Sequence, residues 1–163
     1  MSTILMASQQ DPVDLWRDSL AKEMPELGFR AYPDVGDPGD IDYALVYWAP
    51  HGLIASLPNV RAVFSIAAGC DHVLADPQLP PHLPIVRMVD DYLAAMMAEY
   101  ALYGVLHFHR DMHYYRQEQL AARWSRAWPL YTPDTAVGIL GLGAIGGDCA
   151  RKLGALGFQV HGW

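Results

Sequence analysis

The sequence predicts an α/β protein with a parallel β-sheet, and three observations support this fold class. Short apolar runs alternate with segments of helical pattern, as expected when crossover helices connect the strands. A glycine-rich segment at residues 141–146 stands between an apolar, β-branched run and a further helical pattern. Prolines and turn-forming residues gather between the runs, at residues 33–40 and 76–84.

Residues 1–91 are predicted to form one α/β domain. Asp11 followed by Pro12 is typical of an N-cap with proline at the first helical position, and this helix is expected to end near Met24. The strands predicted in this domain are Ile4–Ala7, Gly28–Tyr32, Tyr43–Tyr47, Ala62–Ile66 and Ile85–Met88.

Residues 92–134 are expected to connect this domain to a second one. Tyr92–Gln119 has few helix breakers and predicts a single long helix, interrupted only by Gly104. The tryptophan-rich segment Arg123–Pro129 follows it. Residues 135–163 then predict the first βαβ unit of a further domain: strand Thr135–Leu140, helix Ala144–Leu156 with Gly157 at its C-cap, and strand Phe158–Gly162. Because the pattern stops there, we expect the chain to be an N-terminal piece of a longer protein.

The composition is that of a packed globular protein. The 163 residues include 11 Lys and Arg against 18 Asp and Glu, for a net charge of −7, and 52% are hydrophobic. An acidic chain without a basic stripe argues against nucleic acid as the main partner. No apolar run reaches the roughly 18 residues that a membrane span needs, and no signal peptide is expected. Cys70 and Cys149 do not make a disulfide framework, so we expect a reducing, cytoplasmic location.

The segment Gly-Leu-Gly-Ala-Ile-Gly at residues 141–146 is the sharpest motif. Its position between a strand and a helix matches the dinucleotide-binding fingerprint. Gly141 would allow the tight turn, Gly143 the close approach of a pyrophosphate, and Gly146 close helix–strand packing. The helix N-terminus would then face the phosphates. The candidate cofactor-binding residues are Gly141, Leu142, Gly143, Ala144, Ile145 and Gly146.

The motif leaves three alternatives open. A glycine-rich turn without a ligand has the same sequence, and the motif does not separate NAD(P) from FAD or S-adenosylmethionine. The acidic residue that selects NAD over NADP is expected about 20 residues after the first glycine. That position falls at or beyond Trp163, so the choice between NAD and NADP cannot be made from these residues.

The order of the motifs resembles the D-2-hydroxyacid dehydrogenase family. Residues 63–71 (Val-Phe-Ser-Ile-Ala-Ala-Gly-Cys-Asp) resemble the family's substrate-side loop, and residues 97–102 (Met-Ala-Glu-Tyr-Ala-Leu) its bridging helix. Residues 141–146 match its fingerprint. Residues 42–46 (Asp-Tyr-Ala-Leu-Val), residues 99–101 (Glu-Tyr-Ala) with 105–107 (Val-Leu-His), and the Trp124 segment are similar to the glyoxylate/hydroxypyruvate reductase branch.

The resemblance implies a flavodoxin-like doubly wound parallel sheet, followed by the start of a Rossmann dinucleotide-binding domain. It implies reduction of a small 2-keto acid to the D-2-hydroxy acid, by hydride from NADP or NAD with NADPH slightly favoured. It also implies a homodimer of the full-length protein. The family's catalytic Arg, Glu and His are expected after Trp163, so none is assigned here. Two positions depart from the family pattern, Met97 for its Val and Ala94 for its Thr.

The substrate-binding candidates lie after two of the predicted strands. Successive backbone N–H groups of Ala68, Gly69 and Cys70 could form an anion-binding nest for a carboxylate. Tyr47 and Trp48 follow a strand at its carboxyl end, where ligands bind in open α/β sheets, although aromatic core packing is an equal alternative. The resemblance adds Met97 on the cofactor side.

Other chemistry-bearing residues favour structural roles. Asp71 and His72 are adjacent and are interpreted as loop surface. His109 and His113 would share a helix face but lack a third ligand, so no metal site is predicted. Cys70 has no neighbouring base and is interpreted as a small buried residue.

Two other functions stay open. A non-catalytic dinucleotide sensor or corepressor could use the same scaffold. A methyltransferase-like βαβ start is disfavoured by the α/β module that precedes the fingerprint. An Arg, a Glu and a His in family spacing after Trp163 would favour the enzyme over the sensor.

Overall fold

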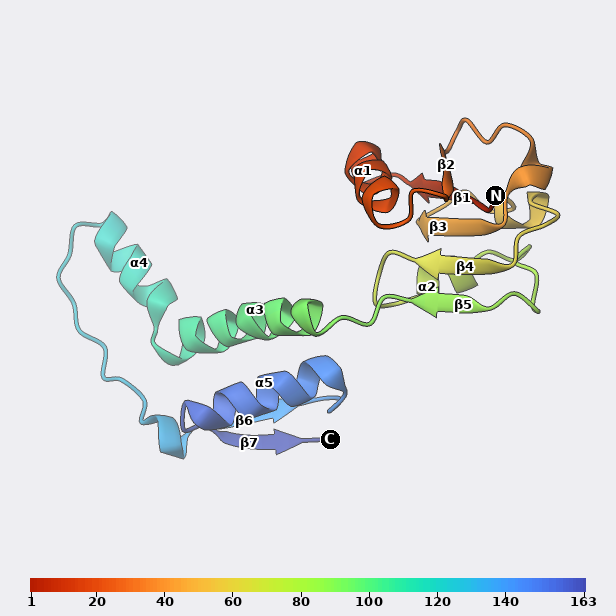
Figure 1. The fold of residues 1–163 in the computed structure, drawn as a ribbon. Helices are drawn as coiled ribbons and strands as arrows, with labels where there is room; N and C mark the ends of the chain where they lie inside the picture. Colours follow the sequence, from red (N-terminus) through yellow and green to blue (C-terminus); the bar gives the residue numbers. More distant parts are fainter. The chain divides into compact units, whose positions relative to one another are not determined.

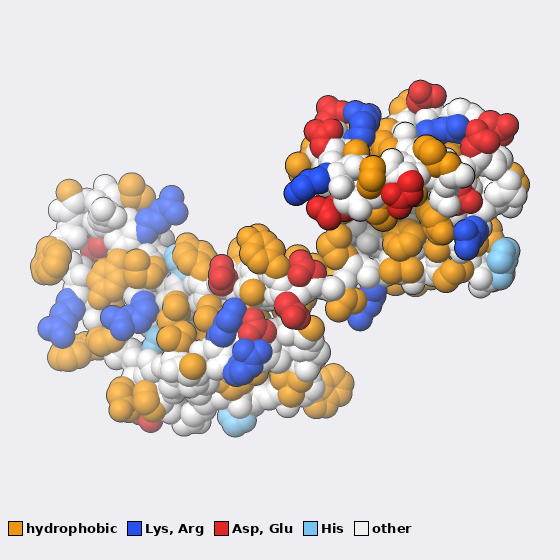
Figure 2. All heavy atoms as spheres, in the orientation of Figure 1, with side chains coloured by type: hydrophobic (Ala, Val, Ile, Leu, Met, Phe, Trp, Pro, Cys, Tyr) orange, Lys and Arg blue, Asp and Glu red, His pale blue; other side chains and the backbone are white.

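The computed structural model describes all residues, Met1–Trp163 (Figure 1). The chain forms two compact units, Met1–Val89 and Asp90–Trp163. On the visible face of the first unit, acidic and basic side chains are interspersed (Figure 2). None of the helices combines the length and the apolar character that a membrane span requires.

The first unit is a five-stranded parallel sheet in the order β2-β1-β3-β4-β5. This is the flavodoxin-type order, and it confirms the predicted fold class. The strands are β1 (Thr3–Ser8), β2 (Gly28–Ala31), β3 (Tyr43–Tyr47), β4 (Ala62–Ser65) and β5 (Ile85–Arg87). The helices are α1 (Val13–Glu23) and α2 (Asp71–Leu74), with 3-10 turns η1 (Pro38–Asp40) and η2 (Ile54–Ser56).

The register brings the carboxyl ends of the central strands together. Ser8 of β1 pairs with Tyr47 of β3, and Val46 of β3 pairs with Ser65 of β4. The strand order reverses between β1 and β3, which makes their carboxyl ends the topological switch point of the sheet. The loops after β1, β3 and β4 therefore leave the sheet side by side.

Alternation along β1 divides the core between the two sheet faces. Leu5 and Ala7 belong to the apolar cluster on one face, whereas Ile4 and Met6 pack with Trp16 of α1 on the other. Leu5 is fully buried. Full burial of such a side chain contributes about 1.5–3 kcal/mol, and truncating it to alanine costs about 2–5 kcal/mol.

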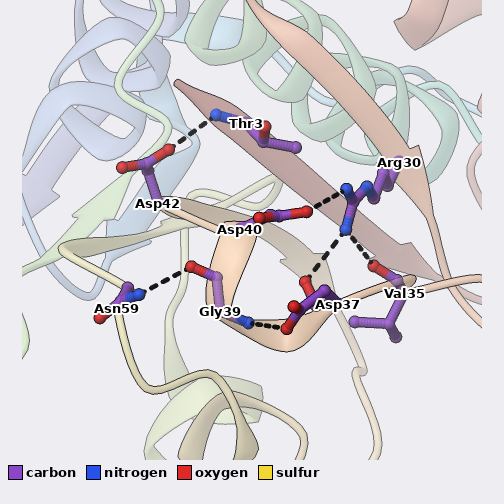
Figure 3. Close-up of polar contacts among 8 residues, drawn as sticks. All are labelled: Thr3, Arg30, Val35, Asp37, Gly39, Asp40, Asp42 and Asn59. Carbon is purple, nitrogen blue, oxygen red and sulfur yellow. Dashed lines mark hydrogen bonds and ion pairs between the residues drawn. The ribbon is translucent and has the colours of Figure 1, made fainter. Parts of the chain in front are cut away.

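A polar network ties the loop before β3 to strand β2 and to the amino end of β1 (Figure 3). Arg30 donates from Nη1 to the carbonyls of Val35, at 2.8 Å, and Asp37, at 3.0 Å. Its Nη2 pairs with Asp40 at 2.7 Å. The backbone N–H of Thr3 donates to Asp42 at 2.8 Å, which holds the start of β1 beside the residue before β3.

The second unit holds a two-stranded parallel sheet in a βαβ unit. Its elements are α3 (Asp91–His109), α4 (Met112–Leu120), η3 (Thr132–Asp134), β6 (Ala136–Ile139), α5 (Ala144–Ala155) and β7 (Gln159–Gly162). Helix α3 packs along α5. Ala94 and Ala98 of α3 are buried, as are Cys149 and Leu153 of α5.

The prediction of one helix over residues 92–119 is wrong, because the helix is interrupted at Arg110 and Asp111. Asp111 has a left-handed backbone, with φ 51°. The ring of the preceding His109 lies edge-on to Phe158, at 4.9 Å between centroids, and its Nε2 is 3.0 Å from Thr132 Oγ1. Aspartate tolerates the left-handed conformation better than most residues. The chain therefore turns where His109 is held, and α4 begins in a new direction.

Two smaller predictions also need correction. Helix α1 begins at Val13 with Pro12 as its cap residue, one position later than predicted. The carboxylate of Asp11 bonds instead to the hydroxyl of Ser8. The short helix α2 was not predicted, because its four residues carry no pattern that distinguishes a helix from a loop.

Candidate cofactor and substrate sites

The glycine-rich turn runs from the end of β6 to the start of α5. Gly141 has φ +89°, a left-handed conformation that favours glycine. Its N–H donates to the carbonyl of Trp163 at 2.7 Å, and the N–H of Trp163 donates to the carbonyl of Ile139 at 3.0 Å. The turn is therefore tied to the end of β7 and held in a fixed position before α5.

The three glycines of the motif face different constraints. A Cβ on Gly146 would lie 1.9 Å from the carbonyl oxygen of Gly141, so this contact admits only glycine. Gly143 has φ −69°, which any residue can adopt, and a Cβ there would meet no protein atom within 4 Å. The fold thus requires Gly141 and Gly146 but leaves open space beside Gly143.

The electrostatics at the start of α5 suit an anion. Gly143 is the N-cap residue and offers no side chain to the first-turn N–H groups, and no acidic residue stands in that turn. These N–H groups have no partner within the helix, and the helix dipole is positive at this end. Together they form the arrangement that binds phosphates in dinucleotide-binding folds.

Asp148, in the next turn of α5, is neutralised by two cations. Its carboxylate pairs with Lys152 at 2.9 Å and with Arg151 at 3.0 Å. The hydrogen bond from Lys152 is the main cause that holds the pKa of Asp148 below its ordinary value, and Arg151 adds to it. The two ion pairs offset the negative charge of Asp148. Its carboxylate therefore repels an anion at the N-terminus of α5 less than an unpaired carboxylate would.

The other cofactor candidates are apolar side chains of the turn, of the first turn of α5 and of α3. Leu142 and Ile145 are partly exposed. Leu142 leans over the end of β7, where a Cβ on Gly162 would come within about 2.5 Å of its side chain. Met97 lies on α3 and is 42% exposed, so it is not a core residue.

In the first unit, the loop after β4 exposes unused backbone donors. The N–H of Ala67 donates to Ser65 Oγ at 3.2 Å. The N–H groups of Ala68, Gly69 and Cys70 donate to no protein acceptor. Three successive free N–H groups could bind a carboxylate. Arg87 Nη1 lies 3.4 Å from the carbonyl of Ala68, which holds that oxygen on the β5 side.

Tyr47 and Trp48 lie at the carboxyl end of β3, beside the switch point. Trp48 has φ +53° and is 54% exposed. A non-glycine residue in this conformation costs about 1–3 kcal/mol and persists only where its surroundings hold it. The amide of Gln9 donates to the carbonyl of Trp48 at 3.4 Å, and the N–H of Trp48 donates to His72 Nδ1 at 3.3 Å. Contacts on both sides thus fix this turn.

The interpretation of His72 as loop surface is wrong, because the side chain is buried with 9% exposure. Its Nε2 lies 2.9 Å from Oγ of Ser65, which is itself buried. The Tyr47 ring stands edge-on to the His72 ring at 5.1 Å. Desolvation lowers the pKa of His72 below its ordinary 6.5, against the opposing effect of the Asp71 carboxylate.

Sequence reasoning missed Ser65 and misplaced His72. The available signal was a hydroxyl at the end of the otherwise apolar strand Ala62–Ser65, since a buried polar group needs a partner. The sequence does not say that this partner is seven residues away, on a helix too short to be recognised. The two residues link the loop after β3 to the loop after β4.

The remaining cysteine and histidine candidates do not come together into a site. Cys70 is half-buried rather than buried, whereas Cys149 is buried. His109 and His113 do not share a helix face, because the chain breaks at Asp111 between them; His113 lies against His107 and Phe108. No group of three or more His, Cys, Asp or Glu side chains is arranged to hold a metal ion.

A parallel βαβ unit with this glycine turn is typical of α/β proteins with a dinucleotide-binding fold, and this is the class of protein that the second unit indicates. A family model described as "D-isomer specific 2-hydroxyacid dehydrogenase, NAD binding domain" matches residues 102–163. Glyoxylate/hydroxypyruvate reductase A of Serratia proteamaculans (strain 568) is 35% identical over 153 residues, which are 91% of this chain and 49% of that protein. The chain is thus similar to proteins of the D-2-hydroxyacid dehydrogenase family, over 91% of its length in the case of the Serratia reductase.

Solved structures show the same similarity. A D-isomer specific 2-hydroxyacid dehydrogenase from Xanthobacter autotrophicus Py2, in complex with NADPH and MES, is 34% identical with a TM-score of 0.90, covering 99% of this chain and 53% of that one. The NADPH-dependent glyoxylate/hydroxypyruvate reductase of Sinorhizobium meliloti, in complex with NADP and sulfate, is 33% identical with a TM-score of 0.89, covering 100% and 52%. A probable 2-hydroxyacid dehydrogenase from Rhizobium etli CFN 42, solved with NADP, HEPES and L(+)-tartaric acid, is 27% identical with a TM-score of 0.84, covering 100% and 52%. The chain thus spans about half the length of the relatives it matches.

Proposed function

We propose that this chain supplies the substrate loop and the phosphate-binding turn of an NAD(P)-dependent 2-hydroxyacid dehydrogenase. The reaction is reduction of a small 2-keto acid, glyoxylate or hydroxypyruvate, to the D-2-hydroxy acid. The observation that carries the proposal is the open space beside Gly143 at the N-terminus of α5. The fold has no need of a glycine there, whereas a pyrophosphate that approaches the backbone does.

The residues present fit a dinucleotide. Gly143 leaves room for the pyrophosphate, and the N–H groups of Ala144 and Ile145 are placed to donate to its oxygens. Leu142 and Met97 would add apolar contacts. The bound nicotinamide nucleotide supplies the hydride. NADPH is favoured over NADH because the three solved structures described above hold NADPH or NADP.

The substrate carboxylate would bind at the loop after β4. The free N–H groups of Ala68, Gly69 and Cys70 can donate to its oxygens without a positively charged side chain. Tyr47 and Trp48 would form an aromatic wall beside it, at the edge of the sheet where open α/β folds bind ligands. Polarising and protonating the keto oxygen requires an Arg, a His and its partner Glu, which we place after Trp163 in a longer, homodimeric protein.

The phosphate-binding turn can be tested on the chain itself. NADPH should shift the amide resonances of Ala144 and Ile145 in ¹H–¹⁵N spectra of the labelled protein. Gly143→Val should abolish these shifts by filling the space with a branched side chain. Gly154→Ala is the matched control, since a Cβ at Gly154 also meets nothing within 4 Å but lies more than two turns further along α5. Equal NADPH affinity in the Gly143→Val variant would remove this turn from the cofactor site.

A further inference from the structure

We infer that Ser65 and His72 are positioning residues that set the carboxylate-binding loop, Ala68–Cys70, against the Trp48 turn. This inference rests on the proposed function, because it concerns the same substrate site. Neither residue offers a free polar atom to a ligand. Both act through the backbone that they hold.

The hydrogen bonds form a continuous chain between the two loops. The N–H of Trp48 donates to Nδ1 of His72, and Nε2 of His72 meets Oγ of Ser65 at 2.9 Å. The same hydroxyl accepts from the N–H of Ala67 and lies 3.0 Å from the carbonyls of Ala67 and Gly69. The hydroxyl of Ser65 thus contacts Ala67, directly before the loop, and Gly69, in the middle of the loop.

These contacts determine the tautomer of His72. Because Nδ1 accepts from a backbone N–H, it carries no hydrogen, and the neutral ring carries its hydrogen on Nε2. Nε2–H then donates to Ser65 Oγ, whose own hydrogen remains for the carbonyl of Gly69 or Ala67. Every polar atom of the pair is engaged, so His72 is not available as a proton donor to substrate.

The pair makes a connection that the sheet does not. The β3–β4 ladder continues to the bond from Ile66 N–H to the carbonyl of Val46 and goes no further. Beyond it, Trp48 takes a left-handed conformation, and the chain after Ser65 curves away. Between the Trp48 turn and the Ala68–Cys70 loop, the imidazole of His72 is the hydrogen-bonded link. Without it, the loop would still be held on the β5 side, by the N–H of Met88 on the carbonyl of Ala67 and by Arg87 on that of Ala68, but the free N–H groups would no longer be set against the Trp48 turn.

Three substitutions each remove a different set of hydrogen bonds between the Trp48 turn and the Ala68–Cys70 loop. Ser65→Ala removes the hydroxyl that orients the loop. His72→Asn keeps an acceptor near the place of Nδ1, for Trp48, and loses the reach to Ser65. His72→Gln keeps a donor near the place of Nε2, for Ser65, and loses the acceptor for Trp48. Ser56→Ala is the matched control, because its exposed hydroxyl bonds only to the Leu53 carbonyl in the same turn.

The probe is oxamate, a stable planar analogue of a 2-keto acid, titrated into the ¹⁵N-labelled chain. In the unaltered protein, the amides of Ala68, Gly69 and Cys70 should shift with saturation. Ser65→Ala and His72→Asn should weaken this binding at least about tenfold while the amides of the buried strand β1 keep their dispersion. The Trp48 amide should lose protection from hydrogen exchange in His72→Gln and keep it in His72→Asn, a difference that general loss of stability would not produce.

The possible failures are distinguishable. Unaltered oxamate affinity in both Ser65→Ala and His72→Asn would overturn the inference and leave the carboxylate site standing. No oxamate-dependent shift at Ala68–Cys70 in the unaltered protein would overturn the proposed substrate site, and this inference with it. If Ser65→Ala does not fold, the inference is tested by the two His72 variants alone. Equal hydrogen-exchange protection of the Trp48 amide in His72→Gln and His72→Asn would then overturn it.

Discussion

The carbonyl oxygen of Gly141 occupies the space that a side chain on Gly146 would need, only 1.9 Å from an added Cβ. The glycine turn is therefore closed on itself, with the first turn of α5 packed against the residue that leaves β6. Gly143, between them, has no such neighbour. Two glycines of the motif thus serve the fold, and the third leaves room for a ligand.

This difference predicts stability effects of unequal size for two similar substitutions. Gly146→Ala should lower the free energy of unfolding of the second unit by about 1–3 kcal/mol or more, because the backbone of the turn must move. Gly143→Ala should cost well under that, about 0.5 kcal/mol for a poorer N-cap residue. Urea unfolding monitored by circular dichroism measures both. Equal midpoints for the two variants would contradict the packing argument.

The core of the fold could be predicted from the sequence because it depends on local apolar runs. Tyr43–Tyr47 was predicted with the observed bounds, since a strand buried in the middle of the sheet carries an uninterrupted apolar segment. The break at Asp111 could not be predicted. It depends on His109 meeting Phe158, a contact between residues 49 positions apart, while Arg110 and Asp111 fit the surface of a continuous helix.

The candidate site was predictable to a different degree in each unit. The fingerprint at residues 141–146 lies within one βαβ unit, so a local pattern was sufficient to find it. The link through Ser65 and His72 depends on three segments that the sheet topology brings together. A serine and a histidine are common residues, and their types do not indicate that they meet.

The 163-residue chain alone should not turn over glyoxylate or hydroxypyruvate with NADH or NADPH. The proposed reaction needs a polarising Arg and a His tuned by a Glu, and these are expected after Trp163. Absorbance at 340 nm, with a full-length reductase of the family as positive control, measures this. A rate in the isolated chain that Gly143→Val abolishes would show that the catalytic groups are already present.

Acid should destabilise the first unit through His72. Burial lowers the pKa of the folded imidazole below the unfolded value of 6.5, so between the two values the unfolded state binds more protons. Stability is therefore full above about pH 6.5 and falls as the pH drops below it. The charged groups close to His72 are Asp71 on its own helix and Asp76, which lines the same small cavity.

Urea midpoints between pH 5 and pH 8 test this dependence. His72→Gln removes the titrating group and should flatten the pH profile in this range, even if it lowers stability throughout. His51→Gln, at an exposed position in the same unit, is the control and should leave the profile unchanged. A profile that stays steep in the His72→Gln variant would assign the acid sensitivity to another group.

The left-handed residue between α3 and α4 gives the last prediction. Asp111 has φ 51°, a conformation that costs an ordinary L-residue roughly 1–2 kcal/mol and glycine almost nothing. Asp111→Val should therefore destabilise the second unit by about that amount, because a β-branched side chain tolerates this backbone poorly. Asp111→Gly should be neutral or slightly stabilising, since the carboxylate accepts no capping hydrogen bond from the first turn of α4. Thermal unfolding of both variants measures the effect. If glycine and valine gave the same midpoint, the backbone at Asp111 would not be held in the left-handed conformation, and residues 92–119 would be free to form the continuous helix that their sequence pattern predicts.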